Sequence, residues 1–289
     1  MSSLQATVPS LSTRSLEQVS DRELRLFADL IYTRTGIRVS PQKKMLMSNR
    51  LRRRLRETGI EGFTAYYDHL RRLPAAHAEW DAFLQEITTH ETYLFRDEQQ
   101  WKWFREVYLP ELSAGTCSGN GLRKLRIWSA AASTGDEAYT VACCVAACLT
   151  NVSQWSVQVF GTDIGVGAVE QARAGVFGER AMRLVPDDYR RRFFTKAKDA
   201  NLWQAKQSLR AMVSFRQHNL MHPLRDRPFD LVILKNVLIY FDAMSKQTVM
   251  ANVRNAVRAG GLLMAGAAEG IAEYVRDFQR LQPWLFRRL

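Results

Sequence analysis

The chain has 289 residues, of which 46% are hydrophobic and 24% charged, which favours a soluble globular protein of two domains and excludes a wholly disordered chain. No apolar run reaches the ~18 residues that span a bilayer, and the N-terminus lacks the pattern of a signal peptide. The formal net charge of +12 favours an anionic partner: nucleic acid, an acidic membrane surface or an acidic protein surface.

The N-terminal part of the chain carries helix signals. Residues 1–15 lack periodicity and are expected to be a flexible tail. Ser20 and Glu23 form a capping-box pattern at a helix start, and Gly36 can supply the left-handed end of that helix. A second helix is predicted to begin at Pro41 and to end before Gly59.

Three more helical segments are predicted, at about 62–72, 78–88 and 97–112. Residues 16–90 are therefore expected to form a small all-α domain. Residues 91–121 are expected to be a linker and a helix, in which 115–121 has the composition of a loop.

From about residue 122 the pattern changes to alternating strands and helices. Strands are predicted at 125–129, 157–162, near Val213, at 229–234 and at 262–265. Helices are predicted from about Glu137 and at about 166–174 and 244–258. This alternation predicts an α/β domain at 122–289 with a parallel sheet covered on both sides.

Three of the four cysteines, Cys143, Cys144 and Cys148, fall on one apolar helical stretch. The chain has no CxxC pair and no histidine spacing that matches a zinc site, so we expect no metal. These cysteines are predicted to be small core residues in a reducing compartment.

Two features are expected beyond the carboxyl ends of the strands, where open α/β sheets bind ligands. The loop at 129–137 is built of small residues and has a single glycine, Gly135, so it matches neither GxGxxG nor a P-loop. Asp163 ends the next strand, where a carboxylate can accept hydrogen bonds from ribose hydroxyls. The pair suggests a nucleoside ligand without phosphates, such as S-adenosylmethionine; the alternative is a tight turn followed by a helix-capping aspartate.

Three stretches resemble the signature sequences of one enzyme family: TTHETYLFRD at 88–97, IWSAAASTGDE at 127–137 and KNVLIYF at 235–241. In this order, and after a helical domain, they resemble the chemotaxis-receptor glutamate O-methyltransferases, the CheR family. The resemblance covers about residues 20–288. It implies a Rossmann-like class I methyltransferase domain, the cofactor S-adenosylmethionine with S-adenosylhomocysteine as product, and chemoreceptor glutamates as acceptors.

The resemblance also implies a set of site residues. Glu137 would hold the amino acid end of the cofactor, Asp163 its ribose, and Asn219 with Leu220 its adenine. The cofactor-binding residues that it implies are His90, Thr92, Arg96, Gly135, Glu137, Asp163, Asn219, Leu220, Lys235 and Asn236.

Two of the residues near the transferred methyl group are expected to be catalytic, Arg96 and Tyr240. A glutamate carboxylate is ionised near pH 7 and is already a nucleophile, so the enzyme has to align the reactants and exclude water. Arg96 can pair bidentately with the acceptor carboxylate, and Tyr240 can place a hydroxyl near the sulfonium. The alternatives are an ion pair of Arg96 with Asp97 and a core tyrosine.

The chain departs from the family pattern at several positions. The family usually has Asn at the position of His90 and Cys-Arg at the position of Leu234-Lys235. It commonly has Gly-His-Ser-Glu where this chain has 266–269, GAAE. The missing histidine leaves open how the far wall of the pocket is built.

The second helix is strongly basic, and its apolar stripe of Met47, Leu51 and Leu55 is expected to hold one face to the domain. The family uses the corresponding helix to dock the receptor, which implies the docking residues Arg50, Arg53, Arg54 and Arg56. The alternative is a solvated charged face. A small β excursion is expected at about 190–212, with a short hairpin at 196–209 that argues against use of a receptor peptide tether.

Two rival functions remain. A nucleic acid methyltransferase suits the charge, but the (D/N)PPY stretch of base-amine methyltransferases is absent after the strand at 229–234. A catalytically idle cofactor-binding module is the second. The favoured interpretation predicts chemoreceptor cytoplasmic helices as partners, no nucleic acid, no membrane insertion, a monomer, and a cytoplasmic location with recruitment to receptor arrays.

Overall fold

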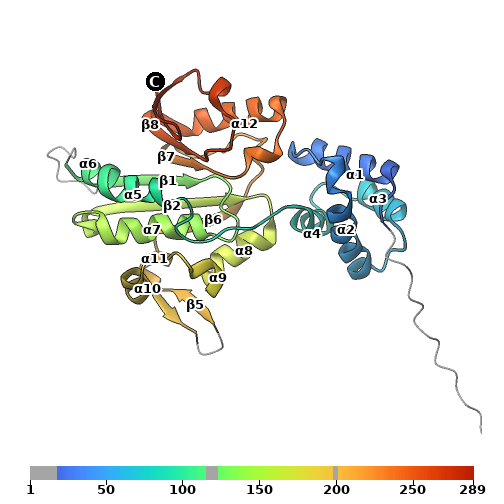
Figure 1. The fold of residues 1–289 in the computed structure, drawn as a ribbon, viewed down its shortest axis with the longest axis horizontal. Helices are drawn as coiled ribbons and strands as arrows, with labels where there is room; N and C mark the ends of the chain where they lie inside the picture. The colour runs from blue at the N-terminus through green and yellow to red at the C-terminus, as the bar shows by residue number, and fades with distance from the viewer. Residues whose placement is uncertain (1–17, 115–122, 198–200) are drawn as a thin grey trace, which may run out of the picture.

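The computed structural model describes residues 18–114, 123–197 and 201–289. The expected tail at 1–15 and the expected loop at 115–121 lie outside these ranges. Figure 1 shows a small helical part beside a larger part built on a sheet. Within the described residues, no helix is long and apolar enough to cross a membrane.

The helical part contains four α-helices: α1 (Asp21–Thr35), α2 (Lys44–Thr58), α3 (Phe63–Arg72) and α4 (Ala78–Ile87). The capping box at the start of α1 is confirmed, because Ser20 and Glu23 bond each other's backbone amides, and Gly36 ends the helix at φ 72°. Pro41 begins a 3₁₀ turn, η1 (Pro41–Lys43), that leads into α2. An aromatic cluster of Phe27, Tyr66 and Phe83 joins three of the helices.

The predicted helix at 97–112 is a continuous helical segment with a π-helical turn in its middle. It consists of α5 (Glu98–Trp103), the π turn η2 (Phe104–Tyr108) and α6 (Leu109–Ala114). Trp101 and Phe104 are buried against the larger part of the molecule, so this segment belongs to its core.

The larger part is built on a seven-stranded sheet with the order β6-β2-β1-β7-β8-β10-β9. Its strands are β1 (Arg123–Ser129), β2 (Trp155–Asp163), β6 (Val213–Gln217), β7 (Phe229–Leu234), β8 (Val257–Ala265), β9 (Phe278–Gln282) and β10 (Leu285–Arg288). The five predicted strands, β1, β2, β6, β7 and β8, pair in parallel, as expected. The sheet also contains two strands that the sequence did not predict, β9 and β10, and β10 runs antiparallel to β8 and to β9. These two strands are short and carry charged residues, so they lack the apolar run that marks a buried strand.

Helices cover both faces of the sheet, as predicted (Figure 1). They are α7 (Asp136–Cys148) and α8 (Val166–Ala174) on one face and α12 (Ala243–Ala256) on the other. Neighbouring strand residues alternate between two cores: Leu231 and Ile233 pack with α7, and Val232 and Leu234 with α12. Burial on both faces explains the continuous apolar run of β7. Cys143 and Cys144 are buried and free.

The predicted end of the last long helix was wrong. The helix α12 ends at Ala256, and β8 begins at Val257, so Gly260 and Gly261 lie inside the strand. The register between β7 and β8 shifts before Leu231. Glycines within a strand often mark such an irregularity, which the sequence pattern alone presented as a turn.

A second, three-stranded antiparallel sheet has the order β3-β5-β4. It begins earlier than the expected range of 190–212, because its first strand precedes two helices. The segment runs through β3 (Val176–Gly178), α9 (Glu179–Met182), α10 (Asp187–Phe193), β4 (Phe194–Lys196), β5 (Leu202–Ala205) and α11 (Gln207–Arg210). The end of the expected hairpin at 196–209 is therefore helical.

Candidate active site

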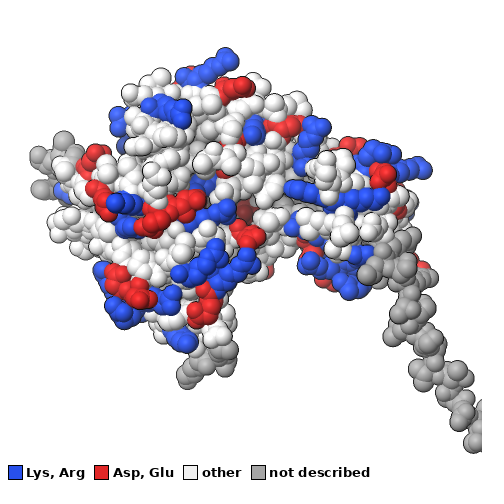
Figure 2. Space-filling view, in the orientation of Figure 1, with Lys and Arg blue, Asp and Glu red and all other residues white. Residues whose placement is uncertain are grey.

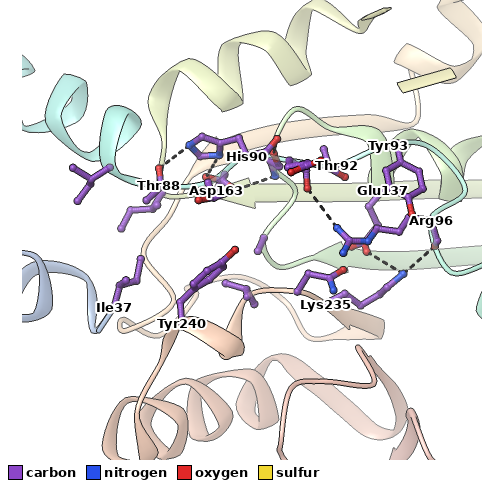
Figure 3. Close-up of a pocket in the computed structure, with 18 of the residues that line it drawn as sticks. Ile37, Thr88, His90, Thr92, Tyr93, Arg96, Glu137, Asp163, Lys235 and Tyr240 are labelled. Carbon is purple, nitrogen blue, oxygen red and sulfur yellow. Dashed lines mark hydrogen bonds and ion pairs between the residues drawn. The ribbon is translucent and has the colours of Figure 1, made fainter. Parts of the chain in front are cut away.

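A pocket lies between the helical part and the carboxyl ends of the sheet strands (Figure 3). Its walls come from the turn before α2, from α2 itself, from the segment at 87–96, and from the loops after β1, β2 and β7. The pocket contains nine of the predicted site residues: Arg50, His90, Thr92, Arg96, Glu137, Asp163, Lys235, Asn236 and Tyr240.

The loop after β1 turns sharply and presents Glu137 at the pocket wall. Gly135 has φ 92°, and a Cβ there would lie 2.9 Å from the Cβ of Ala172, so only glycine fits this turn. Gly135 does not line the pocket itself. Ser129 Oγ donates a 2.7 Å hydrogen bond to Glu137 Oε1. Burial raises the pKa of Glu137, and Lys235 Nζ, 3.8 Å from Oε2, opposes that rise.

Asp163, the last residue of β2, is held by two backbone amides. Oδ2 accepts from Ser133 N and Oδ1 from Gly165 N, both at 2.9 Å. These bonds tie the loops after β1 and β2 together and fix the carboxylate at the pocket wall. The imidazole of His90 lies beside it, with Nδ1 3.7 Å from Oδ1.

The segment that carries Thr92 and Arg96 has an unusual backbone, because Phe95 and Asp97 both have positive φ. Phe95 N donates to Thr140 Oγ1 of α7 at 3.0 Å, and Trp101 Nε1 donates to Arg96 O at 2.6 Å. These bonds from neighbouring elements hold the segment in place. The side chain of Arg96 can then reach the pocket (Figure 3).

The guanidinium of Arg96 is only loosely held. Within the described residues, its hydrogen bond to Glu91 O is long, at 3.4 Å, and its carbon Cζ is 5.6 Å from the ring centre of Tyr93. Asp97, the alternative partner expected from the sequence, pairs instead with Lys235 at 2.9 Å. Arg96 is therefore available to an anionic ligand.

Lys235 follows β7 and is buried at the pocket wall. Its ammonium lies between Asp97 and Glu137 and donates to Arg96 O at 3.3 Å. It therefore joins the segment of Arg96 to the carboxylate of Glu137.

The far wall of the pocket depends on Glu269, which the sequence analysis did not assign to the site. Its carboxylate is fully buried and accepts from the backbone amides of Asn236 and Leu238. Asn236 has φ 57°, and this cradle holds it in that conformation. Gly266 leaves the space, since a Cβ there would lie 2.6 Å from Glu269 Oε1.

Tyr240 is a half-buried pocket residue, not a core tyrosine. Its backbone carbonyl accepts from Arg38 N at 2.8 Å, and Lys43 Nζ lies 5.1 Å from its ring centre. The segment before α2 therefore holds Tyr240 from across the pocket.

Three predicted residues lie apart from the pocket residues. Asn219 and Leu220 do not line the pocket: the Asn219 amide donates to Arg34 O of α1 at 2.7 Å, and Leu220 is buried under α12. Arg54 does not point outward, because its guanidinium is paired with Glu79 at 2.7 Å and with Glu57.

The other docking arginines differ in exposure. Arg53 and Arg56 are exposed on α2, whereas Arg50 is half-buried and donates to Thr89 Oγ1 at 3.0 Å. Figure 2 shows further Lys and Arg side chains over the helical part. Within the described residues, no group of three or more His, Cys, Asp or Glu side chains could hold a metal ion.

Two family models match consecutive parts of the chain. The all-alpha domain of CheR methyltransferases matches residues 22–88, and their SAM binding domain matches residues 90–284. The chain belongs to the CheR methyltransferase family. It is therefore an S-adenosylmethionine-dependent methyltransferase, and the boundary between the two CheR matches falls within the pocket wall at 87–93.

Chemotaxis protein methyltransferases of several bacteria align with this chain over most of their length. A chemotaxis protein methyltransferase of Klebsiella aerogenes is 33% identical over 264 residues, which cover 90% of this chain and 87% of that protein. One of Escherichia coli is 32% identical over 284 residues, covering 96% and 95%, and one of Salmonella typhimurium is 31% identical over 284 residues, covering 94% of each.

Proposed function

We propose that this CheR-family enzyme methylates glutamate side chains on the cytoplasmic helices of chemoreceptors and gives glutamate methyl esters. The relatives that match most of the chain are chemotaxis protein methyltransferases, which supports a chemoreceptor as the acceptor. The observation that carries the proposal is Arg96, a loosely held cation that lines the pocket.

The residues present fit S-adenosylmethionine. Two mostly buried carboxylates lie at the carboxyl edge of the sheet: Glu137 suits the ammonium of the amino acid end, and Asp163 suits hydroxyl donors. When bound, the cofactor supplies a methyl group that its sulfonium has already activated. Burial strengthens both contacts, because few waters compete for these carboxylates.

Methylation of a carboxylate requires that the acceptor is oriented towards the methyl group and that water is excluded from the pocket. A glutamate carboxylate is ionised near pH 7, so no general base is needed. Arg96 orients the carboxylate by a bidentate pair, and Tyr240 on the opposite wall narrows the pocket and helps to exclude water. The enzyme acts as a monomer in the cytoplasm, where the exposed arginines of α2 dock it on an acidic receptor surface.

The test is a methyl-labelling experiment. The purified protein is incubated with methyl-labelled S-adenosylmethionine and receptor-containing membranes, and the labelled product is treated with mild base. Carboxyl methyl esters release volatile methanol, whereas N-methyl groups and most nucleic acid methyl groups do not. We expect base-labile label on a receptor. Base-stable label would contradict the proposal, and cofactor binding without any label would indicate an idle module.

A further inference from the structure

His90 places an imidazole beside the carboxylate of Asp163. Both side chains are mostly buried, with exposed fractions of 15% and 9%, and Nδ1 lies 3.7 Å from Oδ1 (Figure 3). The ring packs against Gly165, where a Cβ would lie 2.8 Å from Cε1 of the imidazole. The position of the ring is therefore confined on one side by the backbone.

The hydrogen-bond network assigns the tautomer of neutral His90. Its Nε2 is 2.7 Å from Thr88 Oγ1, and the Thr88 hydroxyl donates its own hydrogen to Leu84 O at 2.7 Å. Since that hydrogen is used, Thr88 Oγ1 acts as the acceptor and Nε2 carries the proton. Nδ1 of the neutral ring is then an acceptor.

Two acceptors thus face each other at the pocket wall. Neutral Nδ1 of His90 and Oδ1 of Asp163 cannot bond each other, which accounts for their 3.7 Å separation. The two backbone amides bound to Asp163 leave lone pairs on its oxygens for a ligand. Two neighbouring acceptors match a ligand with two neighbouring donors, and the 2′ and 3′ hydroxyls of ribose are such a pair.

We propose that His90 Nδ1 and Asp163 Oδ1 jointly accept the ribose hydroxyls of S-adenosylmethionine, and that protonation of His90 closes this site. The imidazolium has a proton on Nδ1 and donates it to Asp163 in place of the ligand hydroxyl. It also adds a positive charge beside a cationic cofactor. Cofactor affinity is therefore full while His90 is neutral and is lost as pH falls through the pKa of His90 in the free enzyme.

The charged groups around His90 determine the pH at which cofactor affinity begins to fall. Burial lowers the pKa of His90, the Arg50 guanidinium of α2 lowers it further, and the Asp163 carboxylate of β2 opposes both. Gln85 of α4, which also packs at Gly165, is uncharged. The loss of affinity is therefore expected below the usual pKa range of histidine.

The first test measures binding of S-adenosylmethionine by calorimetry from about pH 4.5 to about pH 8.5, which extends below the usual pKa range of histidine. The affinity of the wild-type chain is expected to fall towards about tenfold per pH unit at the acid end. His90→Asn keeps an acceptor but cannot titrate, so its affinity should depend less on pH and its profile should be flatter than that of the wild type. Glu137 and the cofactor's own groups titrate in both proteins, so the difference between the profiles isolates His90.

His218→Asn is the matched control, because burial also lowers the pKa of this histidine, which lies outside the pocket. It should follow the wild-type profile. The proposal is overturned if His90→Asn and the wild type share one profile, or if His218→Asn flattens it equally.

The second test uses S-adenosylhomocysteine that lacks either the 2′ or the 3′ hydroxyl. His90→Leu removes the acceptor, so at pH 8 or so the loss of one hydroxyl should cost it less affinity than it costs the wild type. Equal losses for both analogues in both proteins would contradict a joint site. Neither test needs a methyl acceptor, so both stand apart from the labelling experiment on receptors.

Discussion

At the scale of single residues, Arg96 is the side chain whose surroundings bear most directly on methyl transfer. Arg96 lines the pocket, and the neighbouring carboxylate of Asp97 forms its ion pair with Lys235 and not with Arg96. We expect Arg96→Ala to lower kcat for receptor methylation about 100-fold, because the acceptor loses its orientation. The dissociation constant of S-adenosylmethionine, measured by calorimetry, should change much less.

The control for Arg96 is Lys102→Ala, which removes an exposed cation of α5 outside the pocket. This control variant should leave both kcat and the dissociation constant of S-adenosylmethionine unchanged. Equal and modest losses of kcat and of cofactor affinity in Arg96→Ala would show that this arginine only supports the fold of its segment.

At the scale of elements, the arginines of α2 differ in burial: Arg54 is buried in the helical part, whereas Arg53 and Arg56 are exposed. Arg54 is buried and forms two bonds to Glu79, at 3.1 and 2.7 Å, while Tyr66 donates to the same carboxylate at 2.5 Å. Arg54→Ala would leave Glu79 buried without its cation. We expect the free energy of unfolding, measured by urea denaturation, to fall by about 3 kcal/mol.

Arg53→Ala is the matched control on the same helix, since Arg53 is exposed and its ion pair with Glu86 is 3.3 Å long. Its effect on unfolding should stay within about 0.5 kcal/mol. If the two variants were equally stable, the buried network around Glu79 would not hold the helical part together.

At the scale of the whole molecule, the helical part carries an exposed basic surface next to the pocket (Figure 2). The double reversal Arg53→Glu with Arg56→Glu should raise the KM for receptor about tenfold, because it replaces attraction to an acidic surface by repulsion. Added salt should weaken the effect. Cofactor affinity should stay unchanged, since neither residue lines the pocket.

The same reversal on α3, Arg71→Glu with Arg72→Glu, changes the net charge by the same amount on another exposed helix of the same part. A KM that rose equally in both double variants would point to overall charge, not to a docking surface on α2.

The sequence by itself determined the elements and motifs whose signals are local. Capping at Ser20, the glycine turn at Gly135 and the apolar run of β7 depend on neighbours in the chain, and so they could be predicted. The three family motifs likewise led to the pocket walls at His90, Glu137 and Lys235.

Only the tertiary structure decided the roles that depend on residues far apart in the chain. Arg54 and Arg56 lie on one helix, yet only Arg54 meets the carboxylate of Glu79 from α4. Glu269 reaches the pocket loop because β7 and β8 are neighbours in the sheet. The side-chain amide of Asn219 donates to Arg34 O of α1, a partner that the sequence pattern does not indicate. Helical and strand periodicity specify which face a residue occupies, whereas packing of separate elements decides which partner it meets there.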